Sequence, residues 1–305
     1  MTLKDLEYFI TIVKEGSITR AAAKLYVAQP ALSQYLQKIE KEMGVGLVVR
    51  NSTGVGLTSE GECFLEFAQR VLQEHVELDK KIRDVENAEN GTIRLGCTGT
   101  QATYVLPHIL PAFRSKHPGI DIILVEAQSD EIETKLLRNE VDIGILHPPI
   151  RNEGKLDYFE ISSDDLIVVP RAVSPYQDFV YYKEGCTEPY LDMNFFLEEP
   201  VILTLPLQRS RMVCDQIFAN AGIVPKIKQV CRNIITLNAL AEVDYASVLI
   251  PRKQLSQELE SRDFFRIDES VAVPYPFVMA TAKDCYLPIA VRQLREEFER
   301  KKYTF

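Results

Sequence analysis

Residues 17–58, SITRAAAKLYVAQPALSQYLQKIEKEMGVGLVVRNSTGVGLT, contain the strongest structural pattern in the N-terminal part of the chain. Within it, apolar residues recur at steps of four, three and four, which predicts a helix over residues 29–43 with one buried face. These residues are Leu32, Leu36, Ile39 and Met43. The other faces carry amide, hydroxyl and ammonium groups, with no carboxylate before Glu40. Such a surface suits the base edges and phosphates of a DNA major groove.

The segments around this helix predict a helix-turn-helix followed by a hairpin. Upstream, a first helix ends at Gly16, and Ser17 or Thr19 can cap a second helix whose alanines allow close helix crossing. A short connection leads to the third helix, where Pro30 stands in the first turn. Residues 48–57 then form a short strand, a glycine-rich tip and a return strand. This order is typical of a winged helix-turn-helix, and a small helical bundle is the alternative.

Charge restricts DNA binding to this N-terminal segment. The net charge of the chain is −9, but residues 1–58 hold seven Lys or Arg against five Asp or Glu, a net of +2, so the remainder carries −11. The length of 305 residues predicts two or three domains. Because no apolar run is long enough for a membrane span and no signal sequence begins the chain, we expect a cytoplasmic protein with no membrane partner.

A long helix is expected after the hairpin, over residues 59–90, with Ser59 capping its start. Its apolar residues follow a heptad pattern typical of a dimerisation helix, although a helix packed on its own domain is the alternative. His75 occupies one heptad slot, where a role in setting register is favoured over metal binding or pH sensing. The heptad residues are Phe64, Ala68, Val71, Leu78, Ile82 and Val85.

From residue 92 the pattern changes to strands alternating with helices, which predicts mostly parallel sheets. The expected helices cover 104–116, 131–139, 209–221, 234–243 and 288–302. The expected strands cover 92–97, 121–127, 141–146, 165–170, 200–205, 225–230, 246–251, 264–267 and 276–281. Two lobes joined by crossings near Ser162 and Ile267 would accommodate this order.

Polar residues follow the carboxyl ends of several predicted strands, where open α/β sheets bind ligands. The candidate effector-binding residues are Thr98, Gly99, Thr100, Gln101, Gln128, Ser129, His147, Thr204, Gln208 and Asn233. Helix N-termini at the same edge favour a carboxylate or another anionic ligand. The alternative is that Ser129, Thr204 and Asn233 are helix caps or turn residues.

No motif of a catalytic site, a metal site or a cofactor site occurs. The chain lacks GxSxG, GxxxxGK[ST], HExxH and a GxGxxG after a strand, and its six cysteines have no zinc-type spacing. We therefore expect no enzyme activity, no metal and no cofactor. A thiol redox sensor that uses Cys97, Cys214 or Cys231 is the alternative function, with Cys97 the best candidate because it lies at the predicted cleft.

The N-terminal motif resembles that of the LysR-type transcriptional regulators. The likeness rests on AAxxL at 21–25, QPALS at 29–33, IE at 39–40, Arg50 and LTxxG at 57–61. The resemblance implies that Gln29, Pro30, Ser33 and Gln34 approach bases, and that Thr19, Lys38 and Arg50 contact phosphates. Three features depart from the family pattern: Ala28 replaces a serine, Val48 replaces a phenylalanine, and the wing tip is neutral.

The rest of the chain resembles the LysR effector domain, which is similar to type 2 periplasmic solute-binding proteins. The implied fold class is α/β overall, with a winged helix-turn-helix over 1–58, a dimerisation helix over 59–90 and an effector domain over 91–305. Lobe I would comprise 91–162 and 268–305, and lobe II 163–267. The implied partners are double-stranded operator DNA, a small-molecule effector, a second copy in a homodimer or homotetramer and, for an activator, RNA polymerase. Where relatives often have a glycine pair, this chain has Asp244 and Tyr245, which can narrow the pocket.

Overall fold

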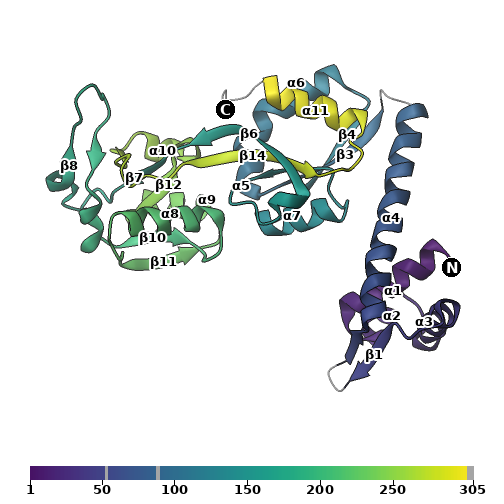
Figure 1. Cartoon of the computed structure of the whole chain (residues 1–305). Coiled ribbons are helices and arrows are strands. Elements are labelled where there is room, and N and C mark those ends of the chain that lie inside the picture. Colours follow the sequence, from purple (N-terminus) through teal and green to yellow (C-terminus); the bar gives the residue numbers. More distant parts are fainter. Residues whose placement is uncertain (52–53, 87–89, 301–305) are drawn as a thin grey trace. The chain divides into compact units, whose positions relative to one another are not determined.

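The computed structural model describes residues 1–51, 54–86 and 90–300, and the chain divides into an N-terminal unit, Met1–Glu86, and a C-terminal unit, Asn87–Phe305 (Figure 1). Among the helices in the described ranges, none combines the length and apolar character that a membrane span requires. The N-terminal unit has the predicted element order. Its elements are α1 (Leu3–Glu15), α2 (Ile18–Lys24), α3 (Gln29–Met43), β1 (Val48–Asn51), β2 (Gly54–Leu57) and α4 (Ser59–Glu86).

The boundaries of the first helices follow from their caps. Gly16 ends α1 in the left-handed region at φ 56°, and the Ser17 hydroxyl accepts a hydrogen bond from the Arg20 N–H at 3.4 Å, so Ser17 rather than Thr19 caps α2. Helix α3 has the predicted bounds, and Ala28 at its N-cap makes no side-chain capping bond. The apolar faces of α1, α2, α3 and the first half of α4 share one core.

Two glycines allow the wing to pack tightly on the helices. The Val55 N–H donates to the Gly16 carbonyl at 2.9 Å, and a Cβ on Gly54 would lie 2.3 Å from the same oxygen. A Cβ on Gly61 in α4 would lie 1.9 Å from the Leu47 carbonyl oxygen. The Glu40 carboxylate accepts hydrogen bonds from the N–H of Leu47 at 2.8 Å and of Val48 at 3.3 Å. The end of α3 is therefore joined directly to the wing.

Helix α4 divides into a packed half and an exposed half. Thr58, not Ser59, caps it, because the Thr58 hydroxyl accepts a hydrogen bond from the Gly61 N–H at 2.9 Å. Phe64 and Ala68 lie in the core of the N-terminal unit. For these two heptad residues, the alternative of a helix packed on its own domain is therefore correct. The later heptad residues Leu78, Ile82 and Val85 are 53%, 47% and 88% exposed. Only this second half of the predicted seam is free to contact a partner.

The first lobe of the C-terminal unit, here lobe I, is built on a five-stranded sheet in the order β4-β3-β5-β14-β6. Helices α6 and α11 pack on one face of this sheet, and α7 packs on the other. The strands are β3 (Gly91–Cys97), β4 (Ile120–Glu126), β5 (Ile143–Leu146), β6 (Leu156–Asp164) and β14 (Tyr275–Ala282). The helices are α5 (Gly99–Tyr104), α6 (Leu106–Lys116), α7 (Ser129–Leu137) and α11 (Ile289–Arg300).

The second lobe, lobe II, is built on a seven-stranded sheet in the order β11-β10-β12-β7-β13-β9-β8. Helix α8 packs with one apolar cluster and helices α9 and α10 with another. The strands are β7 (Leu166–Val169), β8 (Val180–Tyr181), β9 (Tyr190–Leu191), β10 (Val201–Thr204), β11 (Ile227–Cys231), β12 (Ser247–Pro251) and β13 (Phe265–Arg266). The helices are α8 (Arg209–Asn220), α9 (Ile234–Glu242) and α10 (Gln257–Glu260).

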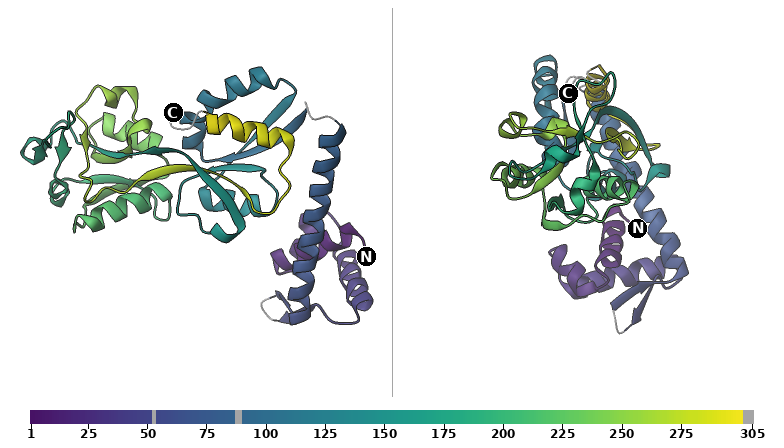
Figure 2. Two further views of the ribbon diagram at one scale, coloured as in Figure 1. Left: turned by 45° about the horizontal axis from the view of Figure 1, so that its top comes forward. Right: turned by 90° about the vertical axis from the view of Figure 1, so that its left-hand side faces the viewer.

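The prediction of mostly parallel sheets is wrong, because both sheets are mixed. Strand β3 pairs in parallel with β4 and β5, whereas β14 pairs antiparallel with β5 and β6. The paired strands β6 and β14 run side by side toward lobe II (Figure 2). Because the chain enters lobe II after one of them and returns through the other, the two must run in opposite directions. The expected helix over 104–116 corresponds to α6, whereas the short helix before it, α5, was not predicted; Thr98 starts α5 with a capping box to Gln101.

Candidate functional site

The predicted DNA-binding residues lie mainly on α3, with Thr19 on α2, and are largely open to solvent. Thr19, Gln29, Pro30, Gln34 and Lys38 are exposed, and Ser33 is half-buried and accepts a hydrogen bond from Gln29 Nε2 at 3.0 Å. These are six of the seven predicted DNA-binding residues. The seventh, Arg50, has its backbone in β1, and its side chain lies outside the described part of the structure.

One residue of α3 differs from the sequence prediction, and another has a partner that the sequence did not reveal. Met43 was expected on the buried face but is 45% exposed, because it is the last helical residue and extends past the core. Lys38, which is predicted to contact phosphates, has its ammonium 3.2 Å from the buried Asp5 carboxylate, which also caps α1. A phosphate contact by Lys38 therefore requires that this ion pair be shared or broken.

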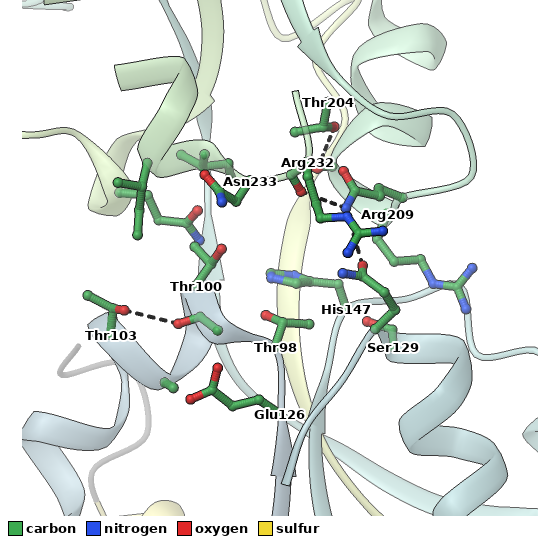
Figure 3. Close-up of a pocket in the computed structure, with 18 of the residues that line it drawn as sticks. Thr98, Thr100, Thr103, Glu126, Ser129, His147, Thr204, Arg209, Arg232 and Asn233 are labelled. Atoms are coloured by element: carbon green, nitrogen blue, oxygen red, sulfur yellow. Dashed lines mark hydrogen bonds between the residues drawn. The ribbon is translucent and has the colours of Figure 1, made fainter. Parts of the chain in front are cut away.

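A cavity of about 580 Å³ opens between the two lobes of the C-terminal unit (Figure 3). Its lining comes from the ends of strands and the starts of helices in both lobes. Nine of the ten predicted effector residues line it: Thr98, Gly99, Thr100, Gln128, Ser129, His147, Thr204, Gln208 and Asn233. Gln101 does not line it, because its side chain is fully buried and accepts a hydrogen bond from the Thr98 N–H at 2.9 Å within the capping box.

Several of these residues also support the local backbone, as the cap and turn interpretation expected. Asn233 caps α9 by accepting a hydrogen bond from the Thr236 N–H at 2.9 Å. Gln208 donates to the Arg232 carbonyl at 2.8 Å, and Thr204 and Ser210 share a hydroxyl hydrogen bond of 2.8 Å. Capping and cavity lining therefore occur together.

His147 forms part of the inner wall and is uncharged near neutral pH. Its Nδ1 lies 2.9 Å from the Pro276 carbonyl oxygen, so this nitrogen donates, and its ring stacks on Tyr275 with centroids 3.7 Å apart. Burial lowers the pKa of His147 to about 3. His147 can therefore offer a ligand hydrogen bonding and ring contact, but no positive charge.

The sequence interpretation missed the charged residues of the cavity. Arg209, the first residue of α8, is 5% exposed, and its guanidinium contacts Asp130 and Glu133 of lobe I. Arg232 and Glu126 also line the cavity, and both are exposed. Each stands at the end of a strand or the start of a helix, so the rule that selected the polar residues also points to these positions. Other unpredicted lining residues are Ala102, Thr103, Ser210, Ile234, Ile235, Gln254 and Tyr275.

Two other expectations about this region are corrected. Asp244 and Tyr245 do not line the cavity: Asp244 binds the Ala172 N–H and Arg262, and Tyr245 lies beneath the Lys228 ammonium.

The cysteines of the redox alternative are in an environment that disfavours the reactive thiolate. Burial raises the pKa of both Cys97 and Cys214 to about 12 and raises that of Cys231. A reactive thiol needs a lowered pKa and solvent access. Within the described residues, no group of three potential metal ligands occurs.

Each of the two units matches a family model built from known proteins. Residues 3–62 match the model of the bacterial regulatory helix-turn-helix protein, lysR family, and residues 86–302 match the LysR substrate binding domain. The Hca operon transcriptional activator HcaR of Escherichia coli is 31% identical over 254 residues, 82% of each chain. The regulator AlsR of Bacillus subtilis is 27% identical over 95% of this chain and 93% of its own. Full-length CbnR complexed with its target DNA superimposes with a TM-score of 0.60 at 25% identity, over 98% and 99% of the two chains.

Proposed function

We propose that this chain, which belongs to the LysR family of DNA-binding transcriptional regulators, responds to a small molecule bound between the lobes of its effector-binding domain. One observation carries the proposal. Nine residues selected only because they follow predicted strands line a single cavity, and they come from both lobes. A ligand that contacts both lobes favours their closed arrangement, and it shifts the protein only as far as it binds that arrangement better.

We place DNA recognition on α3. Gln29, Pro30, Ser33 and Gln34 would approach bases, whereas Thr19, Lys38 and Arg50 would contact phosphates. The exposed amides and hydroxyl of α3 suit hydrogen bonding to base edges. CbnR, whose fold is similar, has been solved with its target DNA.

We propose the domain division and assembly that the sequence implies. Residues 1–58 would form the DNA-binding domain, 59–90 the dimerisation helix and 91–305 the effector domain, with lobe I over 91–162 and 268–305 and lobe II over 163–267. The exposed Leu78, Ile82 and Val85 support pairing through the second half of α4. A homodimer or homotetramer in the cytoplasm would place two or more α3 helices on one operator, and an activator would also contact RNA polymerase.

The DNA-binding part is tested by footprinting beside the gene for this chain, followed by affinity measurements with variants. Gln34→Ala should weaken binding to the footprinted operator by about 1–3 kcal/mol and relax its base preference. Lys38→Ala should weaken binding to all sequences and reduce the salt slope by about 1. Gln69→Ala, an exposed amide on α4, is the matched control and should leave affinity unchanged. Unchanged affinity and base preference in a folded Gln34→Ala protein would contradict the assignment.

The effector part is tested by melting-temperature measurements with small organic carboxylates and other metabolites. A compound that binds the folded state raises the melting temperature in a concentration-dependent way. Thr100→Val and Asn233→Leu should reduce the shift, because both side chains line the cavity. Absence of stabilisation across the whole collection would contradict an effector bound in the cavity.

A further inference from the structure

The interlobe cavity contains two charges that the protein does not neutralise, and they have opposite signs. The Arg232 guanidinium comes from lobe II, and the Glu126 carboxylate comes from the end of β4 in lobe I. Among the described residues, neither group has an ion pair or a side-chain hydrogen bond. Figure 3 shows the two side chains on opposite sides of the cavity.

The other ionisable groups of the cavity are accounted for. The charge of Arg209 is balanced by Asp130 and Glu133, and the burial of His147 keeps its imidazole neutral. The cavity therefore presents one free positive and one free negative charge.

Two buried polar atoms at the same cavity also lack partners. Gln254 lines the cavity with 1% of its surface exposed, and its Oε1 accepts no hydrogen bond. Arg209 lines the cavity with 5% exposed, and its Nε donates none. Buried polar groups are usually satisfied, so an unpaired acceptor and an unpaired donor at one cavity indicate a ligand that carries both a donor and an acceptor.

We propose that the effector is a small zwitterion, whose carboxylate pairs with Arg232 and whose ammonium group pairs with Glu126. This inference rests on the proposed function, because it names the chemical class that the same cavity selects. Arg209 Nε and Gln254 Oε1 supply the matching hydrogen-bond donor and acceptor. The half-buried Ala102 and the exposed Ile235 offer apolar surface to the body of the molecule between its charged ends.

Charge balance is the physical reason for this preference. A carboxylate without an amine satisfies Arg232 but brings a second negative charge into a cavity that already holds Glu126. An amine without a carboxylate satisfies Glu126 but brings a second positive charge into a cavity that already holds Arg232. Like charges in a partly desolvated site disfavour binding, whereas opposite charges in contact favour it. A zwitterion of suitable length avoids both mismatches.

The test uses matched probes on the full chain. One set is 4-(aminomethyl)benzoate, 4-methylbenzoate and 4-methylbenzylamine, and the other is 6-aminohexanoate, hexanoate and hexylamine. Dissociation constants are measured by calorimetry and checked by melting-temperature shifts. At least one zwitterion should bind about tenfold or more tightly than its own carboxylate and its own amine.

Variants then separate charge recognition from loss of fold. Glu126→Gln should remove the advantage of the zwitterion over the carboxylate, and should strengthen carboxylate binding because a like charge is gone. Arg232→Gln should weaken the binding of the zwitterion and of the carboxylate. Glu258→Gln and Arg292→Gln remove one charge of each sign from exposed sites outside the cavity and serve as matched controls. Equal melting temperatures without ligand establish that the variants are folded.

The outcomes distinguish this inference from the proposed function. If a carboxylate binds as tightly as its zwitterion and Glu126→Gln changes neither, the effector cavity stands and the zwitterion inference falls. If neither zwitterion binds while other compounds do, the inference falls in the same way. If no compound of any class binds, both fall.

Discussion

Arg209 Nη2 on α8 lies 3.1 Å from Glu133 Oε1 on α7, so a buried ion pair joins the two lobes of the C-terminal unit. The Glu133 side chain is fully buried, and its second oxygen accepts hydrogen bonds from the N–H groups of Arg151 and Asn152 at 3.0 and 3.1 Å. One carboxylate therefore organises a loop of lobe I and holds the start of α8 in lobe II.

Replacement of Glu133 by glutamine should destabilise the C-terminal unit by about 3–5 kcal/mol, because it leaves the buried Arg209 charge only partly compensated. The measurement is denaturant unfolding followed by far-UV circular dichroism. Glu131→Gln, on the same helix but with a side chain 60% exposed, is the matched control and should change stability by less than about 0.5 kcal/mol. Equal stability of the two variants would show that the interlobe pair has no net effect.

The missing cap of α3 leads to a prediction of increased stability. Ala28 has extended backbone angles suited to an N-cap, φ −70° and ψ 135°, but no side-chain oxygen. Ala28→Ser should stabilise the start of α3 by about 1 kcal/mol, because the serine hydroxyl can accept a hydrogen bond from the first turn. Amide hydrogen exchange at that turn should slow about fivefold. Ala28→Gly supplies no hydroxyl, so exchange as slow in that control as in Ala28→Ser would assign the effect to the backbone.

The sequence predicted the N-terminal unit better than the C-terminal one, for a physical reason. Helix boundaries depend on local signals, such as Gly16 at the end of α1 and Ser17 at the start of α2, and similar signals, Pro30 in the first turn and Gly44 after the last residue, were sufficient for the bounds of α3. The pairing of strands in the C-terminal unit depends on contacts between residues far apart in the chain, and residues 156–164, which form β6, were not predicted as a strand. The antiparallel pairing of β14 with β6, between residues far apart in the chain, was therefore missed.

For the cavity too, the sequence predicted what depends on local patterns and missed what depends on contacts between distant residues. The rule that ligands lie beyond strand ends selected nine lining residues, because strand ends are recognisable from sequence. It also selected Gln101, whose role was decided by a capping box with Thr98. The same rule points to the position of Arg209, but the ion pairs of Arg209 with Asp130 and Glu133 and the unpartnered Oε1 of Gln254 depend on residues far apart in the chain, which the sequence pattern does not reveal.

Gly61 is predicted to be intolerant of any side chain. A Cβ there would lie 1.9 Å from the Leu47 carbonyl oxygen, a backbone atom that cannot move without displacing the wing. Gly61→Ala should therefore destabilise the N-terminal unit by about 1–3 kcal/mol and weaken operator binding. The control is Gly46→Ala, whose Cβ would meet only Glu40 Oε1 at 3.9 Å. Urea unfolding and operator affinity measure the two effects, and a Gly61→Ala protein as stable as the control would contradict the close approach of α4 to Leu47.

His147 should contribute to the pH dependence of stability in a direction fixed by its lowered pKa. The folded pKa is about 3 and the ordinary value is 6.5, so between these values the unfolded chain binds a proton that the folded chain does not. The stability contributed by neutral His147 is therefore present above about pH 6.5 and is lost as the pH falls toward 3. Between about pH 7 and about pH 5.5, the loss should be about 1 kcal/mol.

His147→Asn isolates this contribution, because asparagine can donate to the Pro276 carbonyl but does not titrate. Asp164 acts in the opposite direction, since burial raises its pKa to about 6, but it is retained in both proteins and cancels from their difference. Urea unfolding of the wild type and the variant at the two pH values measures the effect. The wild type should lose more stability than the variant on acidification, and parallel losses would mean that His147 is accessible to protons in the folded state.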